Sequence, residues 1–168
     1  MTVFLHNMWR GDIILNCNFG RPSALARISG ETSKGPTGLV SFYPRKNGTL
    51  VVANISRLPH SDVACSSGIF GFHIHKGTSC CCAGFSQTEG HLDLEDCGHP
   101  QHTGDLPPLF ECGGQAFMAV LTDRFRISDI IGHTVVIHSH PDDFTTQPSG
   151  NSGTKIACGV ISAVSRFV

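Results

Sequence analysis

One short run of metal-binding side chains, in residues 90–106, constrains this chain more than any other stretch. The run reads GHLDLEDCGHPQHTGDL and contains His91, His99, His102 and Asp105. Neutral imidazole and carboxylate are ligands that Zn²⁺ accepts, and four protein ligands close the tetrahedral coordination typical of structural zinc. The alternative is a histidine-rich surface loop without metal, but so many ligands in one run favour a zinc site.

Length and charge narrow the class of protein. The chain has 168 residues and a net charge of −1, which fits one domain and gives no basic surface for nucleic acid or an anionic membrane. Residues 1–20 have no basic segment followed by an unbroken apolar run, because Arg10 and Asp12 interrupt them, so no signal peptide is visible. We predict a flexible N-terminal extension over residues 1–20 and one domain over residues 21–168, with no nucleic-acid or membrane partner.

Short apolar stretches separated by turn-forming residues predict an all-β fold. Strands of this length and spacing are typical of an antiparallel sandwich or Greek-key barrel, and Asn47-Gly48 favours a tight turn. Phe110, Phe117 and Phe125 are predicted to be core residues. The predicted strands are residues 23–29, 39–43, 49–57, 69–75, 115–122, 134–138 and 156–162.

A second set of imidazoles lies on two of these strands. Strand periodicity places His73 and His75 on one face, about 7 Å apart at their Cα atoms, so both can approach one ion. His138 ends another predicted strand. Three imidazoles are one short of a tetragonal copper site, and His91 can supply the fourth because imidazole has two ring nitrogens.

The order of these pieces resembles the Cu/Zn superoxide dismutase family over about residues 21–161. The resemblance is strongest to its bacterial branch, because of the short metal loop and the run Gly-Asp-Leu-Pro-Pro-Leu. It implies an eight-stranded antiparallel Greek-key β-sandwich or barrel, immunoglobulin-like, with a metal-binding loop. The matching pieces are Gly-Phe-His73-Ile-His75, Gly90-His91, His102-Thr-Gly-Asp105, Val-Ile-His138 and Gly150-Asn-Ser-Gly-Thr-Lys-Ile-Ala-Cys158-Gly-Val-Ile161.

The resemblance also implies a role for each matching side chain. Asp142 is similar to the carboxylate that hydrogen-bonds one ligand imidazole of each metal site, and Lys155 stands where the family usually has Arg. Cys80 and Cys158 resemble the family's disulfide. The implied copper ligands are His73, His75, His91 and His138, and the implied zinc ligands are His91, His99, His102 and Asp105.

The eight cysteines contain no CxxC pair, so a zinc module with four cysteine ligands is unsupported. Beside the implied disulfide, Cys97 and Cys112 flank the metal loop and are candidates for a second one. Pairing of Cys17, Cys65, Cys81 and Cys82 stays open. A disulfide fits an oxidising, extracytoplasmic compartment, whereas the lack of a visible signal peptide favours the cytoplasm.

The implied function is superoxide dismutation to dioxygen and hydrogen peroxide by a copper that is alternately reduced and oxidised. In this interpretation His91 bridges copper to structural zinc and moves a proton, and Lys155 attracts the superoxide anion. The alternative is a zinc-stabilised sandwich that binds metal without turnover. We expect a monomer or homodimer.

Overall fold

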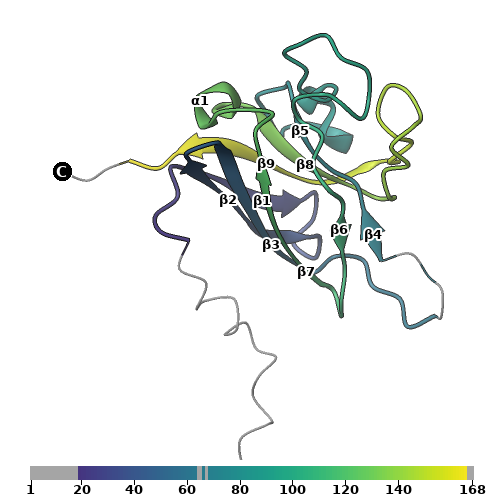
Figure 1. The fold of residues 1–168 in the computed structure, drawn as a ribbon. Helices are drawn as coiled ribbons and strands as arrows, with labels where there is room; N and C mark the ends of the chain where they lie inside the picture. Colours follow the sequence, from purple (N-terminus) through teal and green to yellow (C-terminus); the bar gives the residue numbers. More distant parts are fainter. Residues whose placement is uncertain (1–18, 64–65, 67, 166–168) are drawn as a thin grey trace, which may run out of the picture.

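A computed structural model describes residues 19–63, 66 and 68–165, and in these residues the chain is all-β (Figure 1). Seven strands form one antiparallel sheet in the order β5-β8-β9-β1-β2-β3-β7, and β4 pairs with β6 in a small ribbon. The elements are β1 (Ala24–Gly30), β2 (Thr37–Arg45), β3 (Gly48–Ser56), β4 (Ile69–Phe70), β5 (Phe72–His75), η2 (Ala83–Thr88), β6 (Leu109–Phe110), β7 (Gln115–Thr122), α1 (Ile127–Ile130), β8 (Thr134–His138) and β9 (Lys155–Ala163).

The strand order contains the crossing connections of a Greek key. The chain passes from β3, near one edge, to β5 at the other edge, returns to β7, and crosses again to β8. The expected all-β, antiparallel fold is therefore confirmed. The predicted strand over residues 69–75 is split at Gly71. Its N–H donates to the His140 carbonyl at 2.8 Å, just after β8, and its carbonyl accepts from the His138 amide at the end of β8 at 2.9 Å.

The inner faces of the sheet enclose one hydrophobic core. Phe42, Phe72, Ile74 and Ile137 are completely buried there, and each contributes about 1.5–3 kcal/mol by leaving water. Phe72 and Ile74 thus form the core face of their strand. The two histidines of β5 alternate with these residues on the other face.

The prediction that Phe110 and Phe117 are core residues is wrong. They are 67% and 43% exposed, whereas Phe125 is buried as predicted. Phe117 lies on β7, the edge strand that pairs only with β3 within the main sheet, and its neighbour Ala116 takes the inward position. Both faces of β7 are apolar, so alternation alone cannot tell which one is buried.

The hairpin between β2 and β3 carries the predicted tight turn. Arg45 pairs with Gly48 across it, so Lys46 and Asn47 are its two central residues. Gly48 has a φ of 150°, and a β-carbon there would collide with the Thr122 carbonyl. Glycine is therefore required where the hairpin meets β7.

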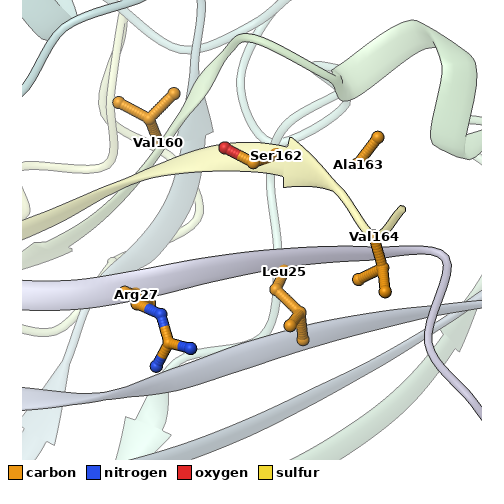
Figure 2. A pocket seen from close by; sticks show the side chains of 6 residues that line it. All are labelled: Leu25, Arg27, Val160, Ser162, Ala163 and Val164. Carbon is orange, nitrogen blue, oxygen red and sulfur yellow. The ribbon is translucent and has the colours of Figure 1, made fainter. Parts of the chain in front are cut away.

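The outer face of β1 and β9 has a pocket. In the sheet, one strand (β8) separates β9 from β5, which carries the histidines, and two strands separate β1 from it. Figure 2 shows Leu25 and Arg27 of β1 beside Val160 and Ser162 of β9. None of the residues that line this pocket is a candidate metal ligand. No helix in the described part of the chain is long and apolar enough to cross a membrane.

Candidate metal centre

Two adjacent strands supply three imidazoles. β5 carries His73 and His75, and it pairs with β8, which ends at His138. His75 Nε2 lies 3.1 Å from His138 Nε2, and all three side chains are buried. Three ring systems therefore meet at the sheet edge that β5 forms.

The loop over residues 90–106 folds against the free edge of β5. Leu92 N–H donates to the Ile74 carbonyl, and Ile74 N–H donates to the Gly104 carbonyl, both at 2.8 Å. Isolated bridges pair His75 with His91 and His73 with Asp105. The backbone pairing of this loop thus places its ligand side chains beside those of β5.

Two groups of four possible ligands result, and they share His91. The first contains His73, His75, His91 and His138, and the second contains His91, His99, His102 and Asp105. Within each group the candidate ligand atoms lie within 4.8 Å of one another, and every member is buried. Every ligand position that the sequence predicts is thus brought into one of two adjoining clusters.

The two nitrogens of His91 face different clusters. Nδ1 lies 2.7 Å from Asp105 Oδ1, and the ring centroid of His91 is 4.0 Å from that of His73 and 4.9 Å from that of His75. The other nitrogen, Nε2, is buried and has no hydrogen-bond partner among the described residues. His91 is therefore able to serve two ions at once.

Unpaired buried nitrogens test whether these clusters suit metal ions. His73 Nδ1 and His91 Nε2 lack a hydrogen-bond partner in the described part of the chain, and His99 Nδ1 and His102 Nδ1 face only the Asp105 carboxylate, at 3.1 and 3.4 Å. A buried polar atom without a partner costs about 1–3 kcal/mol, so this arrangement is costly for a cluster with a purely structural role. Coordination to a metal ion removes that cost, and the residues present fit copper and zinc.

Asp142 connects the two clusters by accepting a hydrogen bond from one histidine of each. Its Oδ2 accepts from His73 Nε2 at 2.7 Å, and its Oδ1 accepts from His99 Nε2 at 2.9 Å. These contacts fix the tautomer of both rings and leave each Nδ1 free as a ligand. Burial alone would raise the pKa of Asp142, but hydrogen bonds from His73, the Phe144 amide and His99 lower it to about 2.

Burial keeps two imidazoles of the first cluster, His75 and His138, neutral. It lowers the pKa of His138 to about 3, with a further contribution from the nearby His73 and His91. Burial, followed by the proximity of His138 and His91, also holds the pKa of His75 well below its usual value. Neutral imidazole is the form that binds a metal, so these rings are ready to act as ligands at neutral pH.

Lys155 lies at the rim of the first cluster. Its Nζ donates to Thr88 Oγ1 at 2.7 Å and to the Glu89 carbonyl at 2.8 Å. His75 Nδ1 donates to the same carbonyl at 2.9 Å. Burial lowers the pKa of Lys155, and the charge of Glu89 acts in the opposite direction.

A disulfide joins Cys80 to Cys158 and so ties the segment after β5 to β9. Among the described residues Cys81, Cys82, Cys97 and Cys112 are free, so the suggested disulfide between Cys97 and Cys112 is wrong. Both of these thiols are exposed. Cys17 and Cys65 lie outside the described residues, as does most of the predicted extension over residues 1–20.

Three further residues also hold the centre. Arg124 donates to the carbonyls of Pro100 and His102, and Gln147 exchanges hydrogen bonds with the His99 backbone at 2.6 and 3.0 Å. Gly150 has a φ of 65°, and a β-carbon there would collide with the Asp142 carboxylate. Arg124 and Gln147 carry no local sequence signal, whereas Gly150 begins the run that carries the family resemblance.

Known proteins resemble this chain in both sequence and structure. The family model described as copper/zinc superoxide dismutase (SODC) matches residues 36–161. The chain is 34% identical to a Cu-Zn superoxide dismutase of Legionella pneumophila, over 74% of this chain and 76% of that protein. It is 30% identical to a Cu-Zn superoxide dismutase of Deinococcus radiodurans, over 88% of each chain. The crystal structure of a double mutant of a SOD-like protein from Bacillus subtilis superposes with a TM-score of 0.71 at 25% identity, covering 83% of this chain and 97% of the other.

Proposed function

The chain belongs to the copper/zinc superoxide dismutase family, and we propose that its two ligand clusters are the copper and zinc sites of this enzyme. Its activity is disproportionation of superoxide to dioxygen and hydrogen peroxide. His73, His75, His91 and His138 hold copper, while His91, His99, His102 and Asp105 hold zinc. The observation that carries this assignment is the set of buried ring nitrogens on both sides of His91 that have no hydrogen-bond partner or face only the Asp105 carboxylate.

The chain's own residues provide orientation and proton transfer around these ions. Bound copper supplies one-electron transfer by alternating between two oxidation states, and d¹⁰ zinc supplies a structural charge. His91 is the proton carrier, because Nδ1 stays directed at the Asp105 carboxylate while Nε2 is free to take up and release a proton. Asp142 keeps His73 and His99 in the tautomer that ligation needs.

Lys155 attracts and positions the substrate anion. An ammonium group has three N–H donors, and Thr88 and Glu89 take two of them, which leaves one for superoxide. Replacing Lys155 by Met should lower the rate by roughly tenfold at low ionic strength and flatten its dependence on salt. An unchanged rate with the same salt dependence would contradict this role.

Metal content and turnover together test the function. Elemental analysis of the purified chain should give one copper and one zinc, with superoxide dismutation that depends on copper loading. His138→Gln should lose copper and activity but keep zinc. His140→Gln is the matched control, because His140 follows the same strand, is exposed, and belongs to neither ligand cluster.

The alternative of a zinc-stabilised sandwich without turnover makes a different prediction. Zinc alone, with no copper uptake and no activity after copper is added, would support it and contradict the dismutase. Retention of activity in His138→Gln would contradict the assignment of the copper ligands.

Three properties of the whole protein complete the proposal. We propose that residues 21–168 carry the activity and residues 1–20 are a dispensable extension, so a chain lacking residues 1–20 should keep full turnover. The Cys80–Cys158 disulfide supports an oxidising, extracytoplasmic compartment. Sedimentation should give a monomer or a homodimer.

A further inference from the structure

Three consecutive cysteines follow β5, and they are in different chemical states. Cys80 is bonded to Cys158, whereas Cys81 and Cys82 are free and exposed. The Sγ atoms of Cys81 and Cys82 lie 2.9 Å apart, which is closer than an ordinary sulfur contact. The other described free thiols, Cys97 and Cys112, have no thiol neighbour of this kind.

We propose that Cys81 and Cys82 form a redox site at which hydrogen peroxide converts the two thiols into a reversible vicinal disulfide. The proposal rests on the proposed function in one respect, since peroxide is the product that dismutation would release. The dithiol lies on the loop that leads from the copper-side strand β5 toward Glu89, whose carbonyl contacts His75 and Lys155. The exposed dithiol and a residue that contacts the metal centre thus belong to the same loop.

The chemistry balances with peroxide as the only oxidant. The Cys81 thiolate attacks one peroxide oxygen, the O–O bond breaks, and a sulfenic acid and hydroxide form. The Cys82 sulfur then attacks the Cys81 sulfur, the S–S bond forms, and the S–O bond breaks. Hydroxide leaves in each step and is protonated, so two thiols and one peroxide give one disulfide and two waters.

The two sulfurs have distinct roles in this sequence. The pKa of Cys82 is raised, first by its hydrogen bond with Cys81 and then by burial and the charge of Cys81. The raised pKa of Cys82 suits the role of resolving thiol, and we assign the attack on peroxide to Cys81. Because the sulfurs are already in contact, resolution needs only a local adjustment of these two residues.

A disulfide between sequence neighbours is expected to be easily reduced. Adjacent Cα atoms are about 3.8 Å apart, below the usual range of about 4.4–6.8 Å for disulfides. Strained and exposed disulfides have the more oxidising potentials, so mild reductants would restore the thiols. Cys80 and Cys158 are 5.7 Å apart at their Cα atoms, and their disulfide is expected to survive the same treatment.

Exchange with the existing disulfide is the main competing reaction. Cys82 lines the same surface pocket as Cys80 and Cys158. Cys158, however, is only 2% exposed, which hinders attack on its sulfur, whereas Cys81 and Cys82 are open to solvent. Access and the short contact between the free thiols favour the vicinal product.

The test exposes the full chain, with its metals bound, to added hydrogen peroxide and maps each cysteine by alkylation and peptide mass spectrometry. We expect Cys81 and Cys82 to lose alkylation together and their peptide to lose two hydrogen atoms, with recovery under a mild thiol reductant. Cys82→Ser should abolish the reversible product and leave Cys81 as an over-oxidised sulfinic acid. Cys97→Ser is the matched control and should leave the vicinal product unchanged.

Two outcomes would overturn the dithiol site. One is oxidation of Cys81 and Cys82 no faster than that of Cys112, and the other is a peptide that links either residue to Cys80 or Cys158. Because peroxide is added directly, the test does not depend on turnover. The vicinal product in a chain without dismutase activity would support the dithiol site and contradict only the proposed function.

Discussion

Replacing Asp142 by Asn should weaken copper binding selectively. The carboxylate is almost completely buried and accepts from both His73 Nε2 and His99 Nε2. Oδ1 also accepts from the Phe144 amide at 2.7 Å, so two donors converge on the oxygen that faces His99. An asparagine keeps one oxygen, which is expected to stay where two donors point. Its NH₂ group then faces His73.

The expected loss of copper affinity follows from the hydrogen bond between His73 and Asp142 that is lost. A hydrogen bond from imidazole to a buried carboxylate contributes about 1.5–3 kcal/mol, and an NH₂ group cannot replace it because both partners would be donors. His73 can escape only by moving its proton to Nδ1, the nitrogen proposed to bind copper. We therefore expect about 10–100-fold weaker copper binding and a change of less than about tenfold for zinc.

Chelator competition for each metal at neutral pH measures both affinities. Asp143→Asn is the matched control, since that neighbouring carboxylate is exposed and bonds only to Thr145 and Thr146. It should leave both affinities unchanged. Equal weakening of copper and zinc in Asp142→Asn, or no weakening of either, would refute the argument from the Phe144 amide.

Three further changes test other parts of the structure. Gly150→Ala should lower the free energy of unfolding by about 2 kcal/mol or more, because its β-carbon collides with Asp142 and its φ is positive; an unchanged urea midpoint would contradict this. The metal-free protein should lose about 2 kcal/mol of stability between pH 6.5 and 5, since the unfolded chain takes up a proton that buried His138, with a pKa of about 3, refuses; flat stability over that range would count against it. Glu89→Gly should raise stability by about 1 kcal/mol in urea unfolding, because Glu89 has φ 59° and ψ −144°, a conformation suited to glycine, and its site contacts come from its carbonyl; a less stable variant would show that the backbone is not strained.

The sequence was most informative where chemistry or periodicity leaves a strong pattern. The strands over residues 115–122 and 134–138 match β7 and β8, and the all-β antiparallel fold follows from such stretches. Phe117 shows the limit of this reasoning. Its strand is apolar on both faces, and only the position of β7 at the edge of the sheet decides that Phe117 faces outward.

The supporting contacts of the metal loop were not predictable, because each depends on segments far apart in sequence. Arg124 follows β7 yet holds carbonyls of the loop around Pro100, and Gln147 holds the His99 backbone from the segment after β8. The residues next to Arg124 and Gln147 in the sequence give no sign that these side chains contact the metal loop. Only the Greek-key crossing from β7 to β8 brings them to the loop.

The segment after β5 connects the Cys80–Cys158 disulfide to Lys155 and His75. The segment after β5 is bonded to β9 through Cys80 and Cys158, and it ends at Glu89, whose carbonyl accepts from Lys155 and His75. Lys155 lies on β9, three residues before Cys158. The loop is thus held to the same strand by a covalent bond near its start and by an ammonium group at its end. Because the His75 ring donates to this carbonyl, the bond that fixes the loop also fixes a proposed copper ligand and the residue proposed to attract superoxide.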